Sequence, residues 1–203
     1  MIMKSNNILP QLLEKEVYSI LTGDFFPWYY SPVTNVKSYE LYGEEGGLTG
    51  AVENPQFYHI FYNEKERRSS YCDLIYAMVN VMSSAANINV ESIVRVKANL
   101  LYRNPDLNQD LSNPIHHDYH DISGKNHEQF LSIVYFVDDS DGDLIVFDKS
   151  WPDMPVGSEE VYRFSPERNS AVFLPSNMYH AGTNPIKNDR RIVISFILKV
   201  QNS

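Results

Sequence analysis

The chain has 203 residues, 43% of them hydrophobic and 21% charged, which is ordinary for a globular protein with one sizeable core. Its formal net charge of -9 argues against a nucleic-acid-binding protein, because such proteins need a positive surface to contact phosphates. The single cysteine, Cys72, excludes an intramolecular disulfide and fits a reducing compartment. No apolar run reaches membrane-spanning length, and residues 1–16 lack the apolar core of a signal peptide. We therefore expect a soluble, cytoplasmic protein without nucleic-acid or membrane partners.

The first half of the chain reads as mainly helical. Residues 11–23 carry apolar side chains at helical spacing and end in a glycine. Residues 69–86 are apolar on most faces of a helix, which predicts a helix buried against a sheet. Between them, the aromatic, proline-punctuated residues 25–33 predict irregular packed chain, and the glycine-rich residues 42–50 predict a mobile loop.

The second half consists of short β-branched and aromatic runs separated by Gly, Pro, Asn and Asp. The runs are 90–102, 130–137, 143–147, 160–164, 170–175 and 190–200. Short strands with polar turns at regular spacing are typical of a sandwich or barrel and not of βαβ units. We expect an α+β, mainly β fold in one domain, 1–203. Its residues 1–89 would form a mainly helical part and its residues 90–203 a jelly-roll core.

The most informative segment is NPIHHDYHD, residues 113–121. In an extended chain, His116 and Asp118 project from one side and His117 from the other. His180 is the one good candidate downstream for a third metal ligand. Two histidines and a carboxylate on one face of an ion are the arrangement of non-haem iron(II) oxygenases, since it leaves positions open for cosubstrate and dioxygen.

The run RRIVISF places an arginine on the same face of a predicted strand as a serine. Arg191, Val193 and Ser195 alternate with Arg190 and Ile192. A guanidinium on an apolar interior face can bind a carboxylate through two hydrogen bonds, and a nearby hydroxyl adds a third. Without an anion, a buried arginine would carry a large desolvation cost. Arg191 therefore predicts a bound dicarboxylic ligand.

Four motifs follow one another in this half of the chain. They are H-x-D (His116, Asp118), the sequence IVYFVDDSDGDLIVFD, the segment FLPSNMYH that ends in His180, and R-x-V-x-S (Arg191, Val193, Ser195). Together they resemble the 2-oxoglutarate/Fe(II)-dependent oxygenase superfamily, on its prolyl 4-hydroxylase-like branch. The resemblance implies a double-stranded β-helix, Fe(II) bound by the two histidines and the aspartate, 2-oxoglutarate chelated to the iron, dioxygen as oxidant, and release of succinate and carbon dioxide. The first ninety residues carry no such resemblance.

One part of the cosubstrate site departs from the family pattern. The position after Tyr135 is often tyrosine in relatives, whereas this chain has Phe136. Tyr102, on the strand that leads towards the ligands, could replace the missing hydroxyl. We therefore take Tyr102 and Tyr135, with Arg191 and Ser195, as candidate contacts of 2-oxoglutarate.

Several of these residues also have plainer interpretations. The histidine cluster taken alone could be a solvated loop, and Arg191 could be a rim residue paired with an acid. His120 shares the face of His116 and is expected on the substrate side, while His59 and His127 are expected to be structural or exposed.

The acidic run at residues 138–143 does not fit a calcium loop, because Val137 and Asp148 stand where an EF-hand needs an oxygen ligand and a bidentate glutamate. We expect a hairpin turn there, with solvated aspartates and Gly142 at positive φ. Cys72 is expected to be a small core residue on a helix.

The resemblance implies a hydroxylase acting on an unactivated C–H bond, since related halogenases lack the carboxylate that Asp118 provides. The substrate would be a prolyl residue in a peptide or protein, or a small molecule. Two alternatives stay open: a non-redox jelly-roll binding module, and a cupin-like metal protein without 2-oxoglutarate chemistry. We expect residues 42–50 and 104–114 to flank the site entrance, because polar loops beside a rigid barrel often close over ligands.

Overall fold

The computed structural model describes residues 2–32, 54–106, 112–118 and 129–201. In chain order the elements are β1 (Met3–Asn6), α1 (Gln11–Leu21), β2 (Tyr29–Ser31), β3 (Gln56–Asn63), β4 (Glu66–Arg67), α3 (Cys72–Ala85), β5 (Val90–Tyr102), β6 (Phe130–Phe136), β7 (Leu144–Ser150), β8 (Glu160–Phe164), β9 (Ser170–Pro175), β10 (Met178–Gly182) and β11 (Arg190–Val200). None of the helices in this part of the chain is long and apolar enough to cross a membrane.

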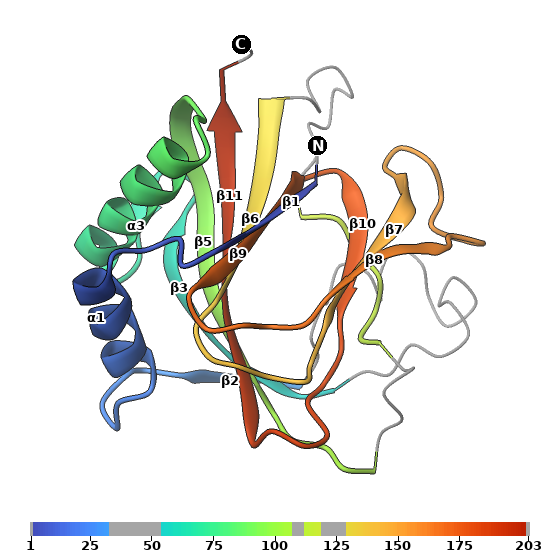
Figure 1. Ribbon diagram of the computed structural model, residues 1–203, viewed down its shortest axis with the longest axis horizontal. Helices are drawn as coiled ribbons and strands as arrows, with labels where there is room; N and C mark the ends of the chain where they lie inside the picture. The colour runs from blue at the N-terminus through green and yellow to red at the C-terminus, as the bar shows by residue number, and fades with distance from the viewer. Residues whose placement is uncertain (1, 33–53, 107–111, 119–128, 202–203) are drawn as a thin grey trace.

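The elements form three layers: helices, a large sheet and a small sheet. The large antiparallel sheet has the order β1-β9-β6-β11-β5-β3-β2, with β4 paired to β3, and the small sheet has the order β10-β7-β8. Helices α1 and α3 cover one face of the large sheet, and the small sheet lies over the other (Figure 1). The predicted α+β, mainly β jelly roll with N-terminal helices packed on it is confirmed.

The alternation of side chains along the strands assigns each residue to one of two cores. On β11, Ile192 and Ile194 pack with residues of α1 and α3 in the core beneath the helices. Val193, between them, packs with Leu144 and Val146 of β7 in the core between the two sheets. A residue's parity on the large sheet therefore decides whether it faces the helices or the space between the sheets.

Most predicted elements are present, with two informative differences. Both predicted helices form, as do all six predicted strands of the second half. The first half is less helical than predicted, because β3 and three shorter strands lie within it and β3 joins the large sheet beside β5. The strand β10 was not predicted either; its sequence, MYHAG, is short and lacks a β-branched residue.

The acidic segment 138–143 is not a hairpin, which corrects the prediction. It links β6 of the large sheet to β7 of the small sheet. Its aspartates are hydrogen-bonded and not simply solvated: Asp138 accepts from the backbone of Ile192 at 3.0 Å. Gly142 has no positive φ. Glycine is needed because a Cβ there would lie 2.7 Å from Cδ of Arg191.

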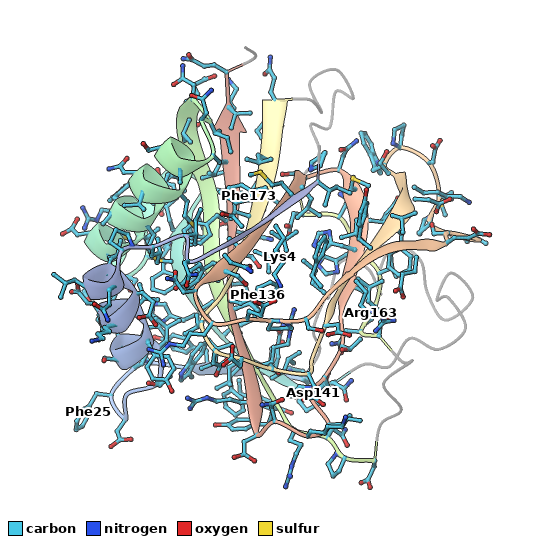
Figure 2. The ribbon with its side chains drawn as sticks, in the orientation of Figure 1. Lys4, Phe25, Phe136, Asp141, Arg163 and Phe173 are labelled. Carbon is cyan, nitrogen blue, oxygen red and sulfur yellow. The ribbon has the colours of Figure 1, made fainter. Side chains whose placement is uncertain are left out.

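Asp141 ties this crossover to the segment before β11. Its carboxylate accepts hydrogen bonds from the backbone N–H groups of residues 186–188, at 3.2, 2.9 and 3.0 Å. Figure 2 labels Asp141 on the side of the view opposite the exposed Phe25, which lies beside α1. Partial burial favours the neutral acid, but the three donors outweigh it and hold the pKa of Asp141 below its ordinary value.

Replacing this carboxylate should destabilise the fold. Asp141→Ala is expected to lower the free energy of unfolding by about 1–3 kcal/mol at pH 7, since three backbone donors lose their acceptor. Because the pKa of Asp141 is depressed in the folded state, the difference from wild type should shrink as the pH falls below about 4. Urea unfolding at several pH values measures this. Asp24→Ala, at an exposed position, serves as the control; equal stability of the two variants would contradict the assignment.

Candidate metal centre

The segment 112–118 lies along β10, at the edge of the small sheet, and pairs with it through an isolated β-bridge between His116 and His180. The N–H of His116 donates to the carbonyl of His180 at 3.0 Å, and the N–H of His180 donates back to the carbonyl of His116 at 2.8 Å. Two residues further on, the N–H of Asp118 donates to the carbonyl of Ser176 at 3.0 Å. These backbone hydrogen bonds place two side chains of the H-x-D motif next to a histidine more than sixty residues later.

The three predicted ligands converge in the space between the sheets. His116, Asp118 and His180 each offer a ligand atom, and these atoms all lie within 4.8 Å of one another. Nε2 of His180 is 3.7 Å from Oδ2 of Asp118. His117 lies on the other side of the strand as predicted, with its ring 5.5 Å from the ring of Tyr179. The predicted cluster is therefore present among the described residues.

Hydrogen bonds orient both imidazole rings. Nδ1 of His116 lies 3.1 Å from the carbonyl of Pro114, and Nδ1 of His180 lies 3.0 Å from the carbonyl of Met178. A carbonyl only accepts, so Nδ1 carries the proton in each ring and the Nε2 lone pair is left for a metal. Burial, reinforced by the neighbouring His180, lowers the pKa of His116 to about 3, so its imidazole is neutral at physiological pH.

Asp118 contributes a buried negative charge. Burial alone would favour its neutral form, but the charges of His180 and Arg95 hold the pKa of Asp118 below its ordinary value. One oxygen, Oδ1, accepts from Nη2 of Arg95 at 3.2 Å. The other, Oδ2, is buried and has no hydrogen-bond partner among the described residues. A buried anionic oxygen without a hydrogen-bond partner among the described residues, beside the imidazoles of His116 and His180, fits a divalent cation of the iron(II) type.

Arg191 lies on the same side of the large sheet, facing the small sheet. Only 5% of Arg191 is exposed, and its Nε donates to the carbonyl of Gly142 at 2.6 Å. A Cβ on Gly182 would lie 3.3 Å from its Nη1, so the guanidinium packs against β10 two residues after His180. Within the described part of the chain, no carboxylate lies at ion-pair distance from Arg191.

The charge on Arg191 is therefore available for a ligand. Burial lowers the pKa of Arg191 to about 10, against the opposing effect of Asp143 and Asp138, and the side chain is still cationic at neutral pH. A buried guanidinium without a carboxylate partner fits a bound dicarboxylate. Ser195 shares this side of β11 with Val193 and is half-buried.

The two tyrosines predicted to contact the cosubstrate face the wrong way, which corrects that prediction. Tyr102 pairs with Arg190, so it has the opposite parity to Arg191, and 57% of it is exposed. Tyr135 is buried in the core beneath the helices. Phe136, the next residue, is the one that faces the space between the sheets.

Other residues singled out from the sequence have structural roles or lie outside the described residues. His59 is structural, bonded to the carbonyl of Pro27 and the hydroxyl of Ser69, each at 2.8 Å. Cys72 is buried at the start of α3, as predicted. His120, His127 and the loop 42–50 lie outside the described residues, as do residues 107–111 of the predicted loop 104–114.

Sequence reasoning missed two cations beside this cluster. Arg95 and Lys97 lie on β5, between β11 and β3 in the large sheet, and face the space between the sheets because they pair with Ile197 and Ser195 of β11. The signal was available: in RVKANL, polar residues alternate with Val96, Ala98 and Leu100, which face the helices. Alternating charges on a central strand indicate a polar site on one of its faces.

Comparison with known proteins agrees with this geometry. Residues 107–199 match the family described as the 2OG-Fe(II) oxygenase superfamily. No curated protein sequence matches the chain.

Solved structures with the same fold include three informative ones. An oxidoreductase of the 2OG-Fe(II) oxygenase family from Burkholderia pseudomallei is 10% identical. The match covers 100% of this chain and 86% of that protein's chain, with a TM-score of 0.61. The epimerase SnoN of nogalamycin biosynthesis, in complex with Fe3+, alpha ketoglutarate and nogalamycin RO, is 10% identical over 98% of this chain and 78% of its own, with a TM-score of 0.54. A prolyl hydroxylase from Trichoplax adhaerens, in complex with a hypoxia inducible factor peptide fragment, is 12% identical over 98% and 83%, with a TM-score of 0.52.

Metal titration tests the cluster itself. Alanine at His116, Asp118 or His180 should weaken binding of Fe(II) or Mn(II) by more than about 100-fold, because losing even an outer partner of a metal ligand costs roughly 10- to 100-fold. His117→Ala, one residue away on the opposite side, should bind the metal as wild type does. Anaerobic calorimetry measures both. If His117→Ala lost the metal while His116→Ala kept it, the assignment would be reversed.

Proposed function

We propose that this chain, whose residues 107–199 match the 2OG-Fe(II) oxygenase superfamily, hydroxylates an unactivated C–H bond of a peptide or small-molecule substrate. Its cofactors are Fe(II), 2-oxoglutarate and dioxygen. The observation that carries the proposal is the juxtaposition of His116, Asp118 and His180 with a buried Arg191 that no carboxylate of the described residues pairs with. Fe(II) with 2-oxoglutarate supplies the activation of dioxygen, and succinate and carbon dioxide are the co-products.

Each residue of the site has a distinct task in this proposal. His116 and His180 would bind the metal through Nε2, because their Nδ1–H groups are held by backbone carbonyls. Asp118 would bind through Oδ2, the oxygen that has no hydrogen-bond partner among the described residues. Arg191 would pair with the distal carboxylate of 2-oxoglutarate, assisted by Ser195 on the same strand face.

The protein also shields the site from water. Phe136, Val193 and Val146 are buried in the core between the sheets, on the same side as the metal cluster. An apolar surrounding strengthens the pairing of Arg191 with a carboxylate and keeps water away from reactive species.

Hydroxylation is favoured by the ligand set. Asp118 retains the carboxylate that halogenating relatives lack, which leaves no room for a chloride ligand. Within the fold, reactions are diverse, since the structural neighbours include an epimerase as well as a prolyl hydroxylase.

Spectroscopy tests the proposed activity before any substrate is known. Anaerobic addition of Fe(II) and 2-oxoglutarate should give a weak visible charge-transfer band, and admission of air should give succinate even without substrate. Asp118→Ala should abolish both, because the metal loses its anionic ligand. A wild-type protein that binds the metal but shows neither band nor succinate would refute the proposal.

The role of Arg191 can be tested against its neighbour. Arg191→Leu should raise the dissociation constant of 2-oxoglutarate at least about 30-fold, the equivalent of roughly 2 kcal/mol for truncating one side of a buried charge pair. Metal affinity should stay unchanged. Arg190→Leu is the matched control, since Arg190 bonds Asp138 at 3.0 Å on the other face. Equal effects of the two substitutions on the charge-transfer titration would remove Arg191 from the site.

A further inference from the structure

We infer that Arg95 and Lys97 form a binding site for an oxyanion of the substrate, a carboxylate or phosphate, beside the metal cluster and apart from Arg191. The inference rests on the proposed function and specifies its substrate class: a molecule that carries an anionic group close to the bond to be oxidised. Arg95 and Lys97 together are the β5 cation pair.

The side chains of the site follow one another in a row. At one end, Nη2 of Arg95 is 3.2 Å from Oδ1 of Asp118. Oδ2 of Asp118 is 3.7 Å from Nε2 of His180. At the other end, Gly182, two residues after His180, packs against the guanidinium of Arg191. The metal cluster therefore lies between two cationic groups.

The two ends of the row serve different ligands. A diacid cosubstrate that reaches from Arg191 to the metal occupies the Arg191 end. The β5 cation pair lies further along the sheet. On β5, Lys97 is four residues and Arg95 six residues from Leu101, the partner of Arg191, distances of about 13 and 20 Å along the strand. A carboxylate paired with Arg191 therefore does not also bridge Arg95 and Lys97, and we assign the ligand of the β5 cation pair to the substrate.

The pair has more positive charge than the described protein neutralises. Arg95 meets one carboxylate, that of Asp118, and its buried Nε has no hydrogen-bond partner among the described residues. The ammonium of Lys97 makes no hydrogen bond or ion pair in that part of the chain; it lies 5.0 Å from the centre of the Tyr58 ring. Because Asp118 is also the proposed metal ligand, its charge is shared with the metal. Two partly buried cations are then left to one shared carboxylate, which is unfavourable unless an anion joins them.

The electrostatics of the β5 cation pair agree with this geometry. Burial, with the nearby charge of Arg95, lowers the pKa of Lys97 to about 8. An oxyanion between the two side chains would relieve this repulsion and accept hydrogen bonds from both.

An aromatic wall continues from the pair towards the edge of the large sheet. The Tyr58 ring, next to Lys97, is 6.0 Å from the ring of Tyr29 on β2, the outermost strand. Tyr29 is 55% exposed. An oxyanion at Lys97 would thus leave the body of the substrate against Tyr58 and Tyr29, which suit an apolar or planar group.

Lysine acetylation followed by peptide mass spectrometry tests the site without a known substrate. The protein is loaded with Zn(II) and 2-oxoglutarate, and the rate of Lys97 acetylation is measured with increasing inorganic phosphate or acetate at constant ionic strength. Either probe, or both, should slow acetylation of Lys97 at least ten-fold and saturably, while Lys199, paired with Glu91 on the surface, is unaffected. Arg95→Gln should raise the half-protecting concentration about ten-fold, through loss of a charged hydrogen bond.

The outcomes separate the two proposals. Protection by phosphate alone assigns a phosphate-bearing substrate, and protection by acetate assigns a carboxylate. Equal slowing of Lys97 and Lys199, no saturation, or protection by 2-oxoglutarate alone with nothing added by either probe would overturn the inference. A parallel sample with Fe(II) reports loading through the charge-transfer band: a normal band with unprotected Lys97 overturns this inference only, whereas an absent band overturns both.

Discussion

The structure of the site depends on the backbone pairing of residues 112–118 with β10. Reciprocal hydrogen bonds between His116 and His180 set the register of the two segments. A shift by one residue would turn His116 and Asp118 outward, where His117 now contacts Tyr179. The same pairing buries Asp118 against the large sheet, so that an otherwise unfavourable carboxylate has Arg95 on one oxygen and the metal position on the other.

The large sheet supplies positive charges on both sides of the metal cluster formed by His116, Asp118 and His180. Its face towards the small sheet carries Arg191 near one end of the row of ligands and the β5 cation pair, Arg95 and Lys97, at the other. Its opposite face is apolar and packs beneath α1 and α3. This division explains why cations are tolerated on central strands: each is expected to meet an anion, from the cosubstrate, the substrate or Asp118.

Much of this arrangement could be predicted from the sequence. Alternation within H-x-D and R-x-V-x-S placed His116, Asp118 and Arg191 on the correct sides of their strands, because parity is a local property. Tyr102 and Tyr135 were misplaced since their assignment came from a family pattern, whereas their own parity relative to Arg190 and Ile194 puts them on the other face of the large sheet. The alternation in RVKANL indicated a polar face on β5, but the contact of Arg95 with Asp118 could not be predicted, because it depends on how a distant segment packs.

A single diffraction experiment can decide whether the metal and the diacid bind at these residues. Crystals grown with Mn(II) and 2-oxoglutarate in the absence of oxygen would give an anomalous difference map at the manganese edge. We predict one strong peak within bonding distance of His116 Nε2, Asp118 Oδ2 and His180 Nε2. We also predict that a carboxylate of the diacid lies against the guanidinium of Arg191. A peak away from these three atoms, or a diacid bound elsewhere, would contradict these predictions.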